Sequence, residues 1–153
     1  MKTFYLVAML LFFGWYAVKL TAADAKAIHE ASATEVAARI TAFSGYVRAY
    51  QLDGNVLTEG TTPGGSIPVP SWFDGASHFS VVTEAGSTYV FMAMPDAAHA
   101  ARVLTQIQYK SASWDKFLAG RNAGGELVTI RPAYDGVVMV PGSIPDNAVV
   151  VGI

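Results

Sequence analysis

The longest apolar run in the chain lies near its N-terminus, at Phe4–Val18 (FYLVAMLLFFGWYAV), between Lys2 and Lys19. Such a run is typical of a membrane anchor, of a cleaved export signal, or of a helix buried in a partner. At about 1.5 Å per residue it spans about 22 Å, less than a hydrocarbon core of about 30 Å. An anchor therefore needs the residues up to Ala23 and a Lys19 ammonium group that reaches the lipid headgroups. The anchor residues that we expect in the membrane are Phe4, Leu10, Phe13, Trp15 and Val18.

The same segment also has the parts of a secretory signal. Lys2 supplies the basic region, Phe4–Phe13 the apolar core, and Ala23-Asp24-Ala25 a cleavage site between small residues. We favour a retained anchor because apolar and aromatic residues continue to Val18, and a lysine follows where a signal usually carries neutral residues. The distribution of lysines favours an N-terminus in the cytoplasm and the bulk of the chain outside it.

A long amphipathic helix is predicted from Thr21 to about Gln51, because this segment is rich in alanine, lacks proline and contains one glycine. The turn signal Leu52-Asp53-Gly54-Asn55 ends it. Its apolar stripe either packs on the chain's own sheet or forms an interface with a partner helix. We favour the first, because the stripe covers barely two heptads. The stripe consists of Val36, Ile40, Phe43, Val47 and Tyr50.

Much of the remaining chain has strand character. His78–Glu84 and Ser87–Met94 are rich in Val, Phe, Thr and Tyr and are joined at Ala85-Gly86, which predicts a β-hairpin. Residues 60–71, rich in proline and glycine, are expected to form a long surface loop. Further strands are expected at Glu126–Arg131, Val137–Val140 and Ala148–Gly152, the last of them central in the sheet because it is apolar throughout.

A second helix is predicted from Pro95-Asp96, where Asp96 caps the first turn, to about Tyr109. Trp114–Leu118 is expected to add one helical turn, and Asn122–Gly125 to form a tight turn. The face of the second helix that we expect to cover the sheet consists of Ala98, Ala101, Leu104, Ile107 and Gln108.

These elements predict an α+β fold. A transmembrane helix leads into the amphipathic helix, and an antiparallel sheet of about five strands follows, covered by the second helix. Residues 1–23 form the anchor or signal, and residues 24–153 form a single domain.

Composition narrows the function classes. Only 14% of residues are charged and 52% are apolar, which suits a protein with a membrane or a partner beside it. The formal charge is −2 and basic residues are scattered singly, so nucleic acid is not an expected partner. The chain has no cysteine, which excludes disulfides and thiolate zinc sites.

No motif predicts catalysis. His29, His78 and His99 lack metal-ligand spacing, and the zincin pattern after His29-Glu30 fails because Ala33 replaces its second histidine. A nucleophile elbow and a phosphate loop are also absent from the sequence. We therefore assign no catalytic, cofactor or metal residues, and we expect a protein that is not an enzyme.

Aromatic residues on loops are the most suggestive feature outside the N-terminal run. Trp72 and Phe73, with Trp114 and Phe117, either anchor an interface or close the core beneath the loop, and we favour closure. Two similar segments, PGGSIP at 63–68 and PGSIP at 141–145, are interpreted as loops built from common turn chemistry, with a shared binding role as the alternative.

The order of elements resembles that of type IV pilins and their assembly partners. A pilin is disfavoured because the candidate peptidase site Gly14-Trp15 is followed by too few apolar residues, and Lys19 stands where pilins usually carry Glu. The chain is more similar to the small PilM family of type IVB and conjugative thin-pilus systems, which is unrelated to the larger actin-like ATPase of the same name. The resemblance rests on FYLVAMLLFFGWYAV, the Thr21–Gln51 helix and the β-rich remainder.

The resemblance implies a component of the pilus basal body in the bacterial inner membrane, single-pass, with the bulk of the chain in the periplasm. It contains no short motif, so no functional residues are transferred. Expected partners are other pilus or secretion-apparatus proteins and the inner membrane, with a homo-oligomer as an alternative. The rival functions are an exported soluble periplasmic binding module with a cleaved signal, and a minor pilin-like subunit.

Overall fold

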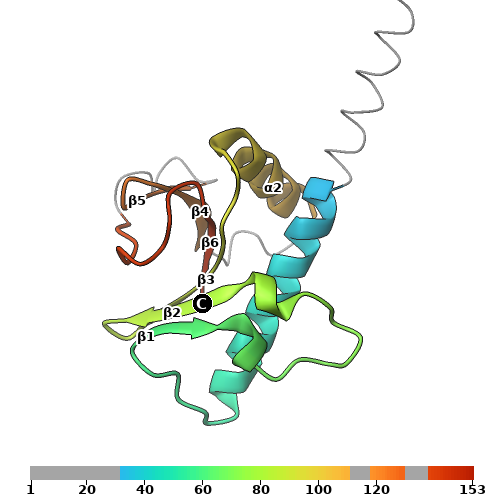
Figure 1. The fold of residues 1–153 in the computed structure, drawn as a ribbon, viewed down its shortest axis with the longest axis vertical. Coiled ribbons are helices and arrows are strands. Elements are labelled where there is room, and N and C mark those ends of the chain that lie inside the picture. The colour runs from blue at the N-terminus through green and yellow to red at the C-terminus, as the bar shows by residue number, and fades with distance from the viewer. Residues whose placement is uncertain (1–31, 111–117, 130–137) are drawn as a thin grey trace, which may run out of the picture. The chain divides into compact units, whose positions relative to one another are not determined.

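A computed structural model describes residues 32–110, 118–129 and 138–153. Its core is an antiparallel six-stranded sheet with two helices on one face (Figure 1), which confirms the α+β class. The predicted N-terminal anchor, Trp114, Phe117 and His29 lie outside the described residues. Within those residues, no helix is both long enough and apolar enough to cross a membrane.

The first helix, described over residues 32–52, ends where its sequence predicts. Gly54 adopts a φ of 85°, which glycine reaches without steric cost. The Gly54 N–H donates to the Gln51 carbonyl at 3.0 Å and the Asn55 N–H to the Tyr50 carbonyl at 3.3 Å. These two bonds form a Schellman motif, which satisfies carbonyls that a helix end leaves free.

The strands follow the order β1-β2-β3-β6-β4-β5, and every neighbouring pair is antiparallel. The last strand therefore lies in the middle of the sheet, as its continuous apolar sequence predicts. The strand bounds are β1 Gly60–Pro63, β2 Ser80–Glu84, β3 Ser87–Met92, β4 Leu118–Ala123, β5 Glu126–Thr129 and β6 Val149–Gly152.

The predicted hairpin is confirmed as β2 and β3, with Ser80 opposite Phe91 and Glu84 opposite Ser87. Its two turn residues, Ala85 and Gly86, have φ values of 50° and 78°. Positive φ at both central positions is typical of a type I′ turn, whose backbone twist matches that of the flanking strands.

The prediction of a long surface loop at residues 60–71 needs correction. Its first four residues, Gly60–Pro63, form β1, and a short 3₁₀ helix, η1 (Gly64–Ser66), follows directly. β1 pairs with β2 alone, so it is an edge strand, where a terminal proline is tolerated because no neighbour needs its missing N–H. The sheet therefore has six strands rather than about five.

Two predictions in the C-terminal third also need correction. Leu118 begins strand β4 (Leu118–Ala123) and does not end a helical turn, whereas the turn predicted at Asn122–Gly125 is confirmed as the connection Gly124-Gly125 between β4 and β5. The predicted strand at Val137–Val140 is reduced, in its described part, to a single bridge between Met139 and Glu126. Small residues such as Gly120 lower strand propensity, so pairing with β5 and β6, and not local sequence, determines β4.

The second helix, α2 (Ala97–Lys110), begins after Asp96, as predicted. The Asp96 carboxylate accepts the backbone N–H of His99 at 2.8 Å, which caps the first turn. The predicted inner face was wrong in part, because Ala98, Ala101 and Gln108 are exposed. The buried side chains of α2 are Ala100, Val103, Leu104 and Ile107.

Both faces of the sheet are covered. Val149 and Val151 of β6 belong to the cluster beneath the two helices, whereas Val150 between them belongs to a second cluster. This second cluster is closed by residues of the 138–148 segment, including Ile144. The alternation follows from the two-residue period of a strand, and it explains why a central strand is apolar at every position.

Asn122 of β4 holds this second layer in place and is 2% exposed. Its side-chain amide donates to the carbonyls of Ile144 at 2.7 Å and Pro145 at 3.2 Å. Its side-chain oxygen accepts the Gly125 N–H at 2.9 Å. One side chain thereby ties the loop before β6 to the β4–β5 turn.

Candidate interaction surface

The structure places the predicted interface residues of the first helix inside the chain's own core. Ile40, Phe43 and Val47 are each 0% exposed, and Val36 is partly buried at the edge of the same cluster. Their apolar surface is already covered by the sheet and by the aromatic residues that follow η1. Only the remaining faces of this helix are available to a partner.

The neighbouring residues Trp72 and Phe73 have opposite environments. Phe73 is 9% exposed, whereas Trp72 is 72% exposed. The Phe73 ring lies 6.1 Å from that of Phe43 and 5.3 Å from that of Tyr46, measured between centroids. Phe73 thus closes the core beneath the loop, and Trp72 projects from it.

Trp72 is held by specific contacts. Its ring meets Tyr46 edge-on at 6.4 Å and Phe73 at 6.3 Å. The Phe73 N–H donates to the Pro70 carbonyl at 2.8 Å, which closes a tight turn around Trp72. A buried ring on one side and a closed turn on the other restrict the motion of the indole, which lowers the entropy that binding would remove.

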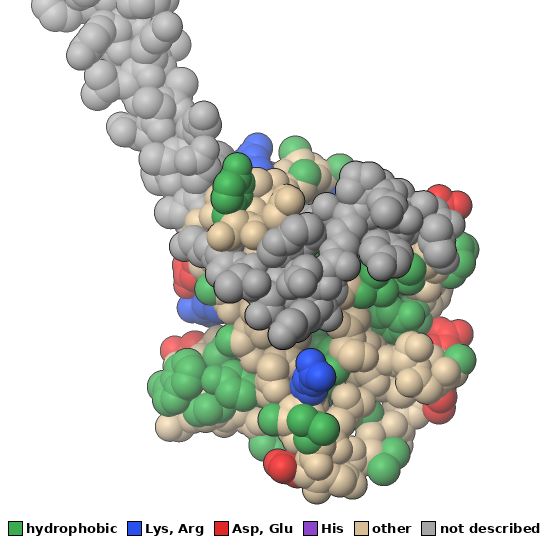
Figure 2. Space-filling view, turned by 180° about the vertical axis from the view of Figure 1, so that it is seen from behind, with side chains coloured by type: hydrophobic (Ala, Val, Ile, Leu, Met, Phe, Trp, Pro, Cys, Tyr) green, Lys and Arg blue, Asp and Glu red, His purple; other side chains and the backbone are tan. Residues whose placement is uncertain are grey.

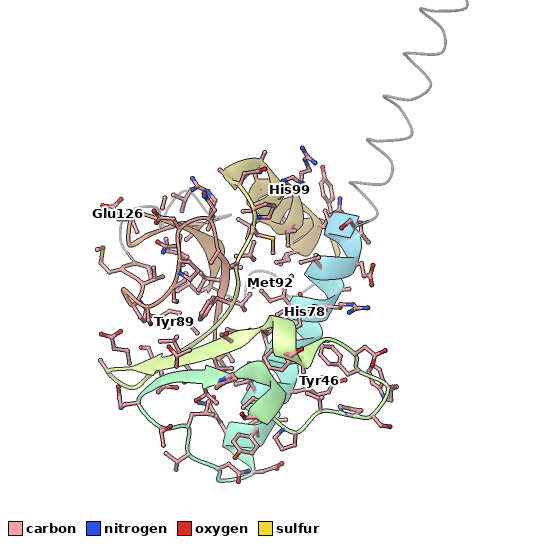
Figure 3. The ribbon with its side chains drawn as sticks, viewed as in Figure 1. Tyr46, His78, Tyr89, Met92, His99 and Glu126 are labelled. Atoms are coloured by element: carbon pink, nitrogen blue, oxygen red, sulfur yellow. The ribbon has the colours of Figure 1, made fainter. Side chains whose placement is uncertain are left out.

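We call Tyr46, Val69, Pro70 and Trp72 the tryptophan surface. Val69 and Tyr46 are partly buried against the core, and Trp72 is the most exposed member. Figure 2 shows hydrophobic side chains gathered over the loop between η1 and η2 (Ala76–His78), and Figure 3 shows Tyr46 on the side of the first helix nearest to it. Apolar side chains gathered on a surface are typical of an interaction site.

Sequence reasoning missed Tyr46. It lies three residues after Phe43 at the border of the apolar stripe, where an aromatic ring contributes an apolar body and a polar tip. Its position three residues after Phe43 on the predicted helix is the sequence feature that could have identified Tyr46 as a surface residue beside the core. Its pairing with Trp72 depends on the loop's return to the helix, which the sequence does not show.

The loop is fixed to the first helix by charge as well. The Arg39 guanidinium donates to the Asp74 carbonyl at 3.3 Å and forms an ion pair with Glu35 at 2.7 Å. Both charged side chains are well exposed, so the ion pair itself contributes little to stability. Its effect is to orient Arg39 toward the backbone that follows Trp72.

Three titratable side chains of the described residues, Glu35, Arg39 and His78, line one small pocket of about 160 Å³. His78, His99 and Glu126 come from η2, α2 and β5 and lie apart (Figure 3). The backbone N–H of His99, followed by its side chain, lowers the pKa of the Asp96 carboxyl. Asp96 and His99 thus act as a helix cap, and within residues 32–110, 118–129 and 138–153 no three potential metal ligands cluster.

The two similar Pro-Gly segments use the same turn. The Ile67 N–H donates to the Gly64 carbonyl at 3.1 Å, and the Ile144 N–H donates to the Pro141 carbonyl at 3.0 Å. Both isoleucines are buried, at 4% and 3% exposure, and they enter the two different core clusters. These placements support the interpretation as common turn chemistry.

Comparison with protein families finds a match to the family described as PilM, over residues 7–151. The match covers nearly the whole chain, including α2, strands β1 to β5 and all of β6 except Gly152. No curated protein and no solved structure matches the chain.

Proposed function

The chain belongs to the PilM family, which indicates a role in pilus assembly, and we propose that it performs this role by binding other assembly proteins through the tryptophan surface. We propose contact rather than catalysis as its mode of action, in a type IV or conjugative thin-pilus apparatus. A chain of this kind brings neighbouring proteins together.

The observation that carries the proposal is the 72% exposure of Trp72 on a rigid support. A tryptophan buries about 150–250 Å² when it is covered, and interface hot spots are enriched in this residue. Truncating a central one typically costs about 2 kcal/mol or more of binding free energy. Exposure of an indole ring to water is unfavourable, and a partner protein that covers Trp72 would remove this cost.

For location, we propose an inner-membrane protein whose Phe4–Val18 run is retained as an anchor, with the domain in the periplasm. The support is the composition of that run and the lysines at its ends. N-terminal sequencing of the mature protein tests this, because cleavage after Ala23-Asp24-Ala25 would give a chain that starts at Lys26. That start would instead support an exported soluble binding module.

The test of the tryptophan surface is Trp72→Ala in the full-length protein, expressed in its native host. We expect the amount of pilus-assembly proteins that co-purify from detergent-solubilised membranes to fall about tenfold or more. The thermal midpoint of the purified domain should change little, because the removed ring is mostly in water.

Tyr109→Ala is the matched control, since Tyr109 on α2 is an aromatic residue with 82% exposure. It should leave co-purification unchanged. Phe73→Ala marks the opposite behaviour and should lower the thermal midpoint, because large-to-small changes at buried aromatic positions typically cost about 3–5 kcal/mol. If Trp72→Ala recovers as much of the pilus-assembly proteins as the native chain does, the proposed role of this surface is refuted.

A further inference from the structure

A second surface lies on another side of the first helix. A groove of about 510 Å³ runs between the C-terminal half of this helix and the end of β6. The described residues that line it are Thr41, Ser44, Gly45, Arg48, Gln51, Leu52, Gly152 and Ile153. From position 41 to position 52 the helical wall extends for about 17 Å, or about three turns.

The walls of the groove are preformed. Thr88 of β3 is 5% exposed, and its hydroxyl accepts the Gln51 side-chain amide at 2.9 Å. Its carbonyl accepts the Ile153 N–H at 3.0 Å. One buried residue therefore fixes a residue from each wall, so an occupant would not have to order them.

The apolar part of the lining is open to solvent. Leu52 is 79% exposed and Ile153 is 39% exposed. Gly45 lies on the same side of the helix, and a Cβ added to it would meet no described atom within 4 Å. A glycine inside a helix costs about 1 kcal/mol relative to alanine, and the described part of the domain offers no packing reason for it. Close approach of another backbone is a reason, as at helix contacts built on small residues.

The charge of the lining indicates which chemical group a bound partner would place opposite it. Arg48 has the only charged side chain among the described lining residues, and it is exposed. Within the described parts of the chain no carboxylate forms an ion pair with it. The hydroxyls of Thr41 and Ser44 already donate to helix carbonyls, at 2.8 Å each. The guanidinium is thus a charged donor without an ion-pair partner among the described residues.

We propose that this groove binds an amphipathic α-helix of a partner protein, with apolar residues against Leu52 and Ile153 and one carboxylate opposite Arg48. A second copy of this chain fits less well, because no side chain of the described lining is acidic and so none can pair with Arg48 across a two-fold axis. This inference does not depend on the tryptophan surface, whose residues are not among those that line the groove.

The probe is a synthetic Leu/Ala-rich helical peptide of about 15 residues, long enough for marginal helicity in water, with a single central Glu. An otherwise identical peptide carries Lys there. Fluorescence anisotropy with the full-length protein in detergent gives the affinities. We expect the Glu peptide to bind about tenfold more tightly than the Lys peptide, and Arg48→Glu to reverse this order.

Arg102→Glu, at an exposed arginine on α2, is the control and should preserve the preference for the Glu peptide. Amide chemical shifts of Gly45, Gln51 and Gly152 should move with the Glu peptide. The proposal is overturned if both peptides bind equally or these amides do not move. It is also overturned if self-association occupies the groove, or if vesicles of anionic lipid displace the peptide from these amides.

Discussion

The substitution Asn122→Ala should weaken the connection between the loop before β6 and the β4–β5 turn. The alanine loses the two donors that reach the carbonyls of Ile144 and Pro145, and the acceptor of the Gly125 N–H. The backbone bonds of residue 122 to the Asn147–Ala148 segment are retained. The perturbation is therefore confined to one side chain.

The expected loss follows from the number of bonds and their burial. Three hydrogen bonds at a net value of about 1 kcal/mol each give a decrease of about 3 kcal/mol in the free energy of unfolding. Asn122 is 2% exposed, so the carbonyl and N–H groups that lose its side chain as a partner cannot all form hydrogen bonds with water instead. Solvent therefore does not offset the expected loss of stability. For a domain of this size, such a loss lowers the thermal midpoint by about 10 °C.

Thermal unfolding followed by far-UV circular dichroism measures the shift. Asn55→Ala is the matched control, because the Asn55 amide also donates to a carbonyl, that of Tyr50 at 3.0 Å, but is exposed. It should cost less than about 1 kcal/mol. Equal shifts for the two alanine variants would show that the buried network contributes nothing beyond an exposed bond, and the reasoning about Asn122 would be wrong.

Two further predictions concern the turn at η1 and the cap of α2. Gly64→Ala should lower the thermal midpoint by the equivalent of about 1–3 kcal/mol, because its Cβ would meet two backbone carbonyl oxygens of the η2 region. Gly65→Ala, which meets no described atom, should change it by less than about 0.5 kcal/mol, and equal effects would contradict this account. The Asp96 carboxyl has a pKa below its ordinary value of 3.8, so its stabilising effect is complete above that value and is lost as the pH falls through the lowered pKa. Asp96→Asn should therefore weaken the acid-side fall of the thermal midpoint, and an unchanged fall between roughly pH 5 and pH 2 would contradict the linkage.

Local sequence was sufficient where one rule decides the structure. The β2–β3 hairpin follows from strand-forming residues around Ala85-Gly86, and both turn residues adopt the positive φ that the turn requires. The end of the first helix at Gly54 follows in the same way from the conformational freedom of glycine. In each case the deciding interaction lies within a few residues.

Local sequence failed for β4, where tertiary packing decides. The segment LAGRNA has weak strand propensity and contains Gly120. A Cβ at Gly120 would lie 2.6 Å from the Val128 carbonyl oxygen and 2.8 Å from the Leu127 side chain, so only glycine fits this pairing. The residue that argues against a strand in the sequence is the one that allows β5 to approach. The hydrophobic periodicity of the sequence does not show that β5 approaches closely at Gly120.

The candidate site was predictable as a segment but not as a surface. The aromatic pair at 72–73 is visible in the sequence, yet the choice of which ring is buried depends on the turn closed by the Pro70 carbonyl. That turn directs Phe73 toward Phe43 and leaves Trp72 outside. A partner can therefore use Trp72 without disturbing the core.

The first helix determines how the two proposed surfaces relate. Successive residues of an α-helix are about 100° apart, so Tyr46 and Arg48 point about 200° away from each other. The core stripe of Ile40, Phe43 and Val47 lies between them on the inward side. One helix therefore serves the tryptophan surface on one flank and the groove on the other, without sharing a side chain. Because the packed stripe between them resists deformation, a substitution on either flank should leave the opposite surface intact. Two partners bound on these flanks would then be held in a fixed relation by a single rigid element, which is the physical property that an assembly component needs.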